Sequence, residues 1–256
     1  MNIIQEKIKL EYEDYLQKGF CQKARDLNKI VGSGFFDDKN PHYFTGKLDS
    51  KVVTINLNPK SNKKRETKNL FENFSSFWDN YENFGVRNYA SRKWPPQKFD
   101  IKQVMFFKET GLLNLIEEKN IIDKYINLER VIDNKLQWEL IPYGSDEFSF
   151  SKIGKENIKS YLEEAIKVVT LFPRDYIIFK GAVFRDLLHF DNIKKTLDST
   201  FKLKKKDGTF AKKENYQLIN IIIDNELPAT ILPHYAYHIT PLINYGKKMI
   251  ELYPKV

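Results

Sequence analysis

A short buried strand that stops at a proline is the feature that most constrains this chain. Residues 52–55 read Val-Val-Thr-Ile, a β-branched apolar run of the length typical of a strand buried on both faces. Pro59 cannot donate a ladder hydrogen bond and disfavours helical backbone at Asn58, so the chain turns where the strand ends. An open α/β sheet binds ligands at the carboxyl ends of such strands. Asn58, whose amide donates and accepts hydrogen bonds, is therefore a candidate to orient a water or a base edge; the alternative is an ordinary turn.

Further strands and helices alternate along the rest of the chain. We expect strands at 136–141 and 176–179, a hairpin of 218–223 with 229–232, and helices at 155–171, from 181 to 188 and at 242–252. This alternation predicts an α/β fold: a three-layer α/β/α sandwich around a mainly parallel sheet of about four strands. Right-handed crossovers then bring Asn58-Pro59, residues 139–145, Gly181 and residues 234–241 to one edge of the sheet.

The N-terminal residues 1–45 are expected to form a helical segment packed on an α/β domain of residues 46–256, which carries an insertion at about 61–135. Helical spacing of Ile4, Ile8, Tyr12 and Tyr15 supports a helix over residues 3–30. An aromatic stripe in the insertion also has helical spacing (Phe71, Phe74, Phe77, Trp78, Tyr81). Such a stripe favours core packing over a stacking platform for bases.

Composition excludes several classes of protein. No run of 18 apolar residues is present, so we expect no membrane-spanning segment. Cys21 is the only cysteine, which excludes a disulfide within the chain and a four-cysteine zinc or iron–sulfur site. A single cysteine is typical of a protein of the reducing cytoplasm.

Positive charge is concentrated in two places. The chain has a net charge of +8, which favours nucleic acid as a partner. The first cluster directly follows the Asn-Pro turn and is the better candidate for phosphate contacts (Lys60, Ser61, Lys63, Lys64, Arg65). The second consists of lysines around Asp207-Gly208, a β-hairpin signal. A solvated hairpin tip explains this cluster as well as phosphate binding does.

Four segments together resemble the uracil-DNA glycosylase superfamily. Residues 52–61 are similar to its first motif, a strand that ends in an Asn-Pro or Asp-Pro loop, and Trp138-Glu139-Leu140-Ile141-Pro142-Tyr143 resembles its second strand. Residues 176–182 look like the third strand with its glycine turn, and residues 229–242 resemble the last strand and its histidine- and proline-containing loop. The similarity covers about residues 45–250 in the right order. The four cysteines of the iron–sulfur members are absent, which points to a branch without a cluster.

The resemblance implies a DNA glycosylase that hydrolyses the N-glycosidic bond of a flipped-out base without metal or cofactor. Such an enzyme needs a placed water and a donor aimed at the departing base. Asn58 stands at the water-orienting position, and because an amide is a poor general base, slow turnover is expected. The donor is His234, which directly follows the strand, or His238, which has the better local sequence. Two metal ligands at this spacing are disfavoured, because the surrounding residues do not read as a helix.

The base-binding residues depart from the family pattern. Glu139 replaces the usual amide, and because a carboxylate only accepts hydrogen bonds, it suits a base with an exocyclic amino group rather than uracil. The alternative is that Glu139 pairs with a basic neighbour. Tyr143, Phe74, Phe71 and Phe77 are candidates to stack on the base. We therefore expect a DNA glycosylase acting on a modified or damaged base, in repair or in defence against foreign DNA. The alternatives are an inert nucleic-acid-binding or sensor protein on the same fold, and a hydrolase of free nucleotides.

Overall fold

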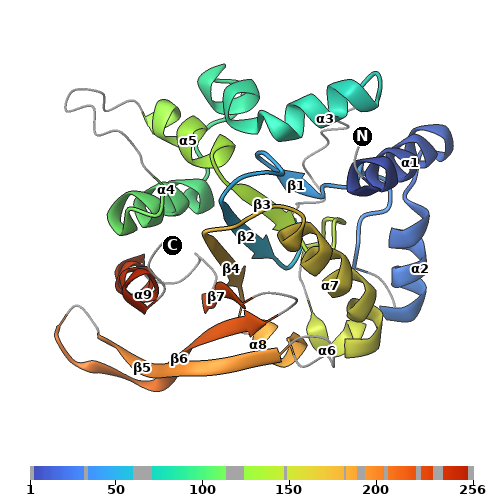
Figure 1. Cartoon of the computed structure of the whole chain (residues 1–256). Coiled ribbons are helices and arrows are strands. Elements are labelled where there is room, and N and C mark those ends of the chain that lie inside the picture. The colour runs from blue at the N-terminus through green and yellow to red at the C-terminus, as the bar shows by residue number, and fades with distance from the viewer. Residues whose placement is uncertain are drawn as a thin grey trace.

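The chain forms three layers, with one mixed sheet between two layers of helices (Figure 1). The computed structural model describes residues 3–31, 34–59, 71–113, 124–146, 149–181, 183–188, 194–204, 207–222, 226–232 and 239–252. This architecture is the three-layer α/β/α sandwich that the alternation of strands and helices predicts.

The helices are α1 (Ile3–Lys18), α2 (Gln22–Val31), α3 (Phe74–Glu82), the π-helix η1 (Gly85–Ala90), α4 (Lys98–Thr110), α5 (Lys124–Asp133), α6 (Phe150–Ile153), α7 (Lys155–Thr170), α8 (Phe184–Leu187) and α9 (Ile239–Leu252). The strands are β1 (Phe44–Thr45), β2 (Val52–Asn56), β3 (Leu136–Glu139), β4 (Tyr176–Lys180), β5 (Lys194–Lys204), β6 (Phe210–Ile222) and β7 (Glu226–Leu232).

Four parallel strands form the centre of the sheet, in the order β3-β2-β4-β7. Antiparallel strands extend it on both sides among the described residues: β1 pairs with β3, and β6 pairs with β7 and then with β5. The parallel centre agrees with the expected four strands, and the hairpin of β6 with β7 is the predicted one. The antiparallel additions make the described sheet seven-stranded, larger than predicted.

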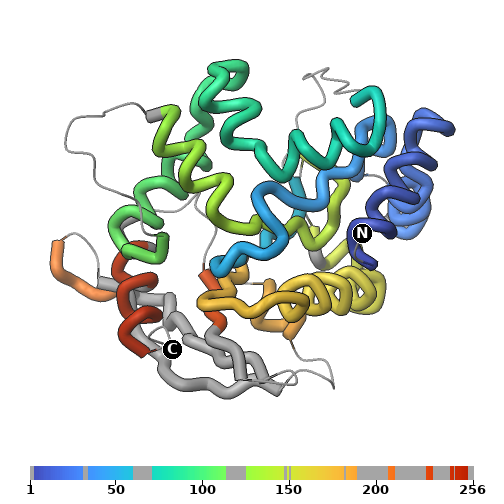
Figure 2. Tube along the Cα trace, turned by 45° about the horizontal axis from the view of Figure 1, so that its top comes forward, coloured from blue at the N-terminus to red at the C-terminus, as the bar shows by residue number. Residues whose placement is uncertain are grey.

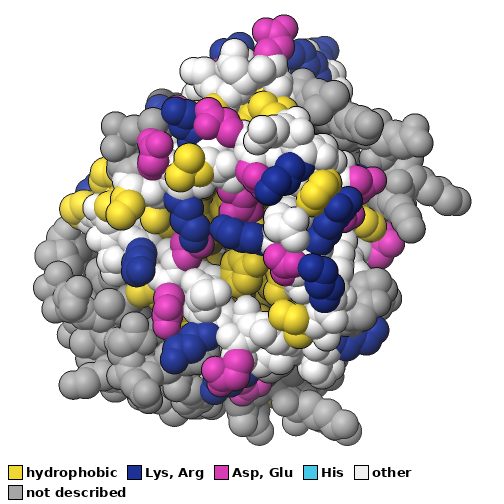
Figure 3. Space-filling view, turned by 90° about the vertical axis from the view of Figure 1, so that its right-hand side faces the viewer, with side chains coloured by type: hydrophobic (Ala, Val, Ile, Leu, Met, Phe, Trp, Pro, Cys, Tyr) yellow, Lys and Arg dark blue, Asp and Glu magenta, His cyan; other side chains and the backbone are white. Residues whose placement is uncertain are grey.

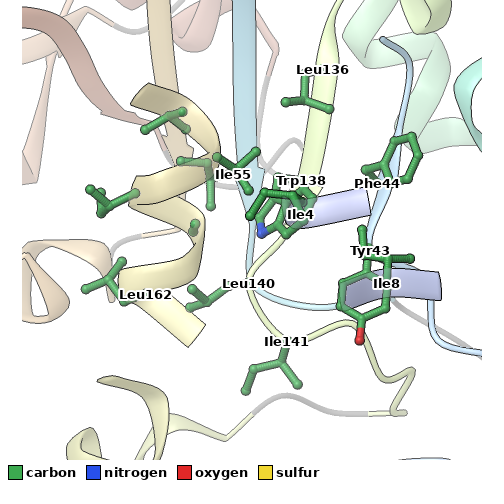
Figure 4. Close-up of a cluster of buried hydrophobic side chains, with 14 of the residues drawn as sticks. Ile4, Ile8, Tyr43, Phe44, Ile55, Leu136, Trp138, Leu140, Ile141 and Leu162 are labelled. Carbon is green, nitrogen blue, oxygen red and sulfur yellow. The ribbon is translucent and has the colours of Figure 1, made fainter. Parts of the chain in front are cut away.

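One face of the sheet is apolar and packs against α1, α3 and α7. Val53 and Ile55 of β2, Trp138 of β3 and Phe179 of β4 are buried in one cluster with the predicted helical face of α1. Figure 4 shows Ile4 and Ile8 of α1, Leu162 of α7 and the strand residues Ile55 and Trp138 meeting in this cluster. The aromatic stripe of α3 belongs to the same cluster, so its interpretation as core is confirmed.

The opposite face of the sheet is covered by α4, α5 and α9. Helices α4 and α9 lie side by side in both views of the chain (Figure 1, Figure 2) and contact each other. The alternation of a strand sends every second side chain to this face. At the start of the strands these side chains are apolar, as with Val52 and Tyr176. Toward the carboxyl ends they become polar, as with Asn56, Glu139 and Lys180.

One local expectation was wrong. Residues 3–30 are two helices rather than one, because Gly19 adopts a left-handed conformation (φ 73°) that ends α1. The insertion at about 61–135 contains α3, η1, α4 and α5 among its described residues. Asp133 of α5 helps to form η1, because its carboxylate oxygens accept hydrogen bonds from the backbone nitrogens of Gly85 and Val86.

Charges of both signs alternate on the surface formed by α1 and α2. Figure 3 shows lysine and arginine side chains interspersed with acidic ones on this side of the molecule. Ion pairs account for part of the pattern, such as Lys18 with Asp14 and Lys29 with Asp26. This surface is therefore not a basic stripe. No helix in the described part of the chain is long and apolar enough to cross a membrane.

Candidate functional site

The direction in which the chain adds strands to the sheet reverses between β2 and β4. The chain leaves β2 for β3 on one side and later returns to β4 on the other side. At such a reversal the loops that follow two adjacent strands diverge, and open α/β sheets bind ligands there. Leu57 and Gly181, which follow these two strands, lie close together: a Cβ on Gly181 (φ +136°) would be 3.3 Å from Leu57 Cδ1. The loops after β2 and β4 thus define the edge where a ligand is expected.

Asn58 is held in one orientation at this edge. Its Nδ2 donates to Ser145 Oγ (2.7 Å) and to the carbonyl oxygens of Tyr143 and Pro59 (both 3.3 Å). Carbonyl oxygens only accept hydrogen bonds, so the amide nitrogen must face them. The half-buried side chain therefore keeps its Oδ1 as the atom that can accept a hydrogen bond from a water or a substrate.

Glu139 is buried at the end of β3, beside Asn56 of β2. Its Oε1 accepts hydrogen bonds from Asn56 Nδ2 (2.8 Å) and Gln137 Nε2 (2.9 Å). Burial raises the pKa of the Glu139 carboxyl, and the two amide donors and the charges of Lys180 and Lys135 partly oppose that rise. Glu139 thus lies among amide donors and within the field of two lysines.

Lys180, the last residue of β4, is fully buried on the same face. Its Nζ donates to Gln103 Oε1 of α4 (3.2 Å) and lies 5.4 Å from the centre of the Phe99 ring. Burial holds the pKa of the Lys180 amine well below its usual value, and the nearby charge of Lys135 adds to this, while Glu139 and Asp100 act against it. Helix α4 therefore covers the polar end of the sheet with matching polar side chains.

A second buried lysine completes this polar layer. Lys135 Nζ donates to Gln137 Oε1 (3.1 Å), and burial lowers the pKa of its amine to about 8. Asp100 of α4 accepts from Gln103 Nε2 (3.0 Å) and from the hydroxyl of Tyr89. Burial raises the pKa of the Asp100 carboxyl. The layer therefore contains two lysines, two carboxyl groups and several amides, most of them bonded to one another.

Two buried oxygens in this layer have no hydrogen-bond partner among the described residues. They are Oε2 of Glu139 and Oδ1 of Asn56, and the two side chains are bonded to each other. A buried acceptor without a donor costs about 1–3 kcal/mol, so a water or a ligand donor is expected at these atoms. The oxygens of an amide and of an ionised carboxylate only accept, so with Glu139 ionised the pair favours a ligand that presents N–H groups.

The structure separates the expected site residues into two groups. Asn58 and Glu139 lie at the same carboxyl edge, because Asn56 Nδ2 bonds to Glu139 and Leu140 N bonds to Asn56 O (2.9 Å). Tyr143 and Phe74 belong instead to the apolar cluster on the opposite face. The Tyr143 hydroxyl donates to Glu11 of α1, and the Phe74 ring contacts Tyr12 of α1. The expectation that these two rings stack on a base beside Glu139 is therefore wrong.

The remaining candidates lie outside the described residues: His234, His238, Lys60, Ser61, Lys63, Lys64 and Arg65. In the part of the chain that is described, no three His, Cys, Asp or Glu side chains are grouped to hold a metal ion.

Sequence reasoning missed Asn56, Lys180 and Gln103. For Asn56 and Lys180 a signal was present, because each is a polar residue at the carboxyl end of an otherwise apolar buried strand. Gln103 carried no such signal, since one glutamine in an amphipathic helix resembles a solvated residue.

Comparison with known proteins gives no assignment: no family model matches the chain, and no curated protein matches it.

Proposed function

We propose that the chain is a DNA glycosylase that hydrolyses the N-glycosidic bond of a modified or damaged base. A water adds to C1′ of the sugar, the bond from C1′ to the base nitrogen breaks, and the base leaves with the electron pair of that bond. The second product is an abasic site, and the proton lost by the water balances the charge on the base. No cofactor is required by this reaction.

The observation that carries the proposal is the fixed amide of Asn58. Its nitrogen is held by two carbonyls and a hydroxyl, so its Oδ1 offers one defined acceptor at the edge where ligands bind in open α/β sheets. A water donating to this oxygen would be positioned without being strongly deprotonated. Placement alone contributes to rate, and the weak basicity of an amide predicts slow turnover.

Glu139 supports the choice of an amino-bearing base. Its unpartnered Oε2 and the unpartnered Oδ1 of Asn56 are acceptors that a base with N–H groups could satisfy. Uracil presents a carbonyl oxygen at the position where cytosine carries its exocyclic amino group, and that oxygen would meet another acceptor. The proposed substrates are therefore derivatives of cytosine, adenine or guanine.

The test is release of a base from oligonucleotides that carry a panel of uracil-, cytosine-, adenine- and guanine-derived lesions. We expect at least one amino-bearing lesion to give an alkali-labile abasic site. Asn58→Ala should lower the rate at least 100-fold, while Asn134→Ala, which removes an exposed amide at the end of α5, should leave the rate unchanged. If no lesion is cleaved under any condition and DNA binding is unaffected by Asn58→Ala, the chain is a binding protein on this fold.

A further inference from the structure

The hairpin formed by β5 and β6 continues past the rest of the sheet. In the described part of the chain, β6 pairs with β7 from Leu218 to Ile222 and with β5 over its whole length. Residues 199–204 and 210–217 therefore form a two-stranded ribbon that has no third strand among the described residues. At about 3.3 Å per residue, positions 210–217 span roughly 25 Å. Figure 1 shows this ribbon along the lower side of the molecule, with its tip at the left beside α9.

The register shows the direction in which the ribbon leaves the sheet. Leu218 pairs with Thr230, β6 runs antiparallel to β7, and β7 ends at Leu232, so positions before Tyr216 lie beyond the carboxyl end of β7. The ribbon therefore extends past the carboxyl end of β7, and its free end lies beside α9 (Figure 1).

Half of the net charge of the chain lies in this ribbon and its turn. Residues 199–217 contain six lysines and two acidic residues, a net charge of +4 out of the +8 of the whole chain. Lys202 and Lys204 belong to β5, and Lys212 and Lys213 to β6. Phe210, which pairs with Lys204, is largely exposed. A concentration of charge of this kind contrasts with the mixed charges on the α1 and α2 surface.

We propose that this ribbon binds duplex DNA by lying in the major groove, with its lysines against the phosphates. The major groove of B-form DNA is about 12 Å wide and admits a two-stranded β-ribbon, whereas the major groove of duplex RNA is too narrow for side chains to read. The ribbon would give affinity without sequence preference, since phosphate contacts carry no base information. The choice of DNA rests on the proposed function; the charge and shape of the ribbon do not.

A competing explanation is that the lysines only protect an exposed strand edge. Edge strands commonly carry lysine, which prevents pairing with a second copy of the chain. That explanation predicts self-association after the lysines are removed and no effect on DNA. The two explanations therefore differ in a measurable way.

The test compares two variants with equal loss of charge, both measured on plain duplex DNA without any lesion. The ribbon variant carries Lys202→Gln, Lys204→Gln, Lys212→Gln and Lys213→Gln. The control carries Lys9→Gln, Lys18→Gln, Lys23→Gln and Lys29→Gln on α1 and α2, where these lysines pair with acidic residues. Circular dichroism and thermal melting verify that both variants are folded. A third protein with the four ribbon lysines changed to arginine keeps the charge.

We expect the ribbon variant to bind duplex DNA at least 10-fold more weakly than the parent. The slope of the logarithm of the DNA-binding constant against the logarithm of the salt concentration should decrease in magnitude by about 3 to 4, for up to four lost phosphate contacts. The control and the arginine variant should stay within about threefold of the parent, and duplex RNA should bind more weakly than DNA. Equal losses in the ribbon variant and the control, unchanged binding of the ribbon variant, or equal affinity for duplex RNA would each overturn the proposal. Self-association of the ribbon variant with intact DNA binding would support edge protection instead.

This measurement also separates the ribbon from the catalytic proposal. Duplex binding that depends on the ribbon, without base release from any oligonucleotide, refutes only the glycosylase. Base release that depends on Asn58, with binding unaffected by the ribbon variant, refutes only the ribbon.

Discussion

Replacing Lys180 by methionine tests whether the polar end of the sheet is one electrostatic unit. The amine is fully buried, bonds to Gln103, and lies in the field of Glu139 and Asp100. Methionine fills a similar volume but removes the charge that favours ionisation of the two carboxyl groups. Removing the amine leaves the buried Oε1 of Gln103 without its donor, which costs about 1–3 kcal/mol, so we expect the free energy of unfolding of Lys180→Met to fall by about that amount.

The second half of the test is the double variant. Glu139→Gln removes the opposite charge and leaves Lys180 with Asp100 as its buried acidic neighbour. When both Lys180 and Glu139 are neutral, neither leaves the other uncompensated. The cost of Lys180→Met combined with Glu139→Gln should therefore be about 1–3 kcal/mol smaller than the sum of the single costs.

Urea unfolding at pH 7, followed by circular dichroism, measures all four proteins. The dependence of the free energy on urea should be the same in each, so that midpoints report stability alone. If the two single costs add within about 0.5 kcal/mol, Lys180 and Glu139 do not interact, and the description of the layer as one unit is refuted.

Three other predictions concern single positions. Lys135 has a folded-state pKa of about 8 against an ordinary 10.5, so its buried amine contributes stability at high pH that is lost as the pH falls toward 8. Urea unfolding should therefore show the wild-type free energy of unfolding rising between pH 8 and pH 10 by about 1 kcal/mol per unit relative to Lys135→Met, and parallel curves would contradict this. Gly46→Ala places a Cβ 1.9 Å from the backbone oxygen of Lys135 at φ +84°, and thermal melting should show a loss of stability above about 2 kcal/mol. The control Gly111→Ala, also at positive φ but with no atom within 4 Å of the added Cβ, should lose only about 1 kcal/mol of stability. Equal losses would refute the steric argument. In the wild type two backbone carbonyls accept hydrogen bonds from the amide nitrogen of Asn58, and Asn58→Asp turns a carboxylate oxygen toward them instead. Base release should therefore slow. A faster enzyme would show that the amide is not held in this orientation.

Much of the layer architecture could be predicted because it depends on local patterns. The apolar runs at β2 and β4 are short, bounded by turns and rich in β-branched or aromatic residues, so their identity as buried strands follows from composition. Helix α7 begins after Gly154 and ends before Pro173, and its apolar residues recur with helical spacing. In these elements, local propensity and tertiary burial favour the same structure.

The β5–β6 ribbon and the polar layer could not be predicted in the same way. β5 reads Lys-Lys-Thr-Leu-Asp-Ser-Thr-Phe-Lys-Leu-Lys, which lacks the long apolar pattern of a central strand, and its pairing depends on the turn at Asp207-Gly208. Lys135 and Lys180 would be assigned to the surface by residue type alone. Their burial depends on amides and carboxylates from segments far apart in the chain, which only the fold brings together.

The candidate site shows the same division. Asn58 at the carboxyl end of β2 was predictable from the proline that follows it, whereas the orientation of its amide depends on Ser145 and Tyr143 in a distant loop. The assignment of Tyr143 and Phe74 to base stacking was wrong because residue type does not reveal the face of the sheet to which a ring turns.

Base release from lesion-bearing oligonucleotides by wild-type protein and Asn58→Ala, followed by liquid chromatography of the freed base, tests the central claim most directly. Release of an amino-bearing base by the wild type and its loss in the variant, with unchanged melting temperature and unchanged duplex binding, is the predicted result. Equal release by both proteins would remove Asn58 from the chemistry, and the carboxyl edge of β2 and β4 would no longer be the reacting site.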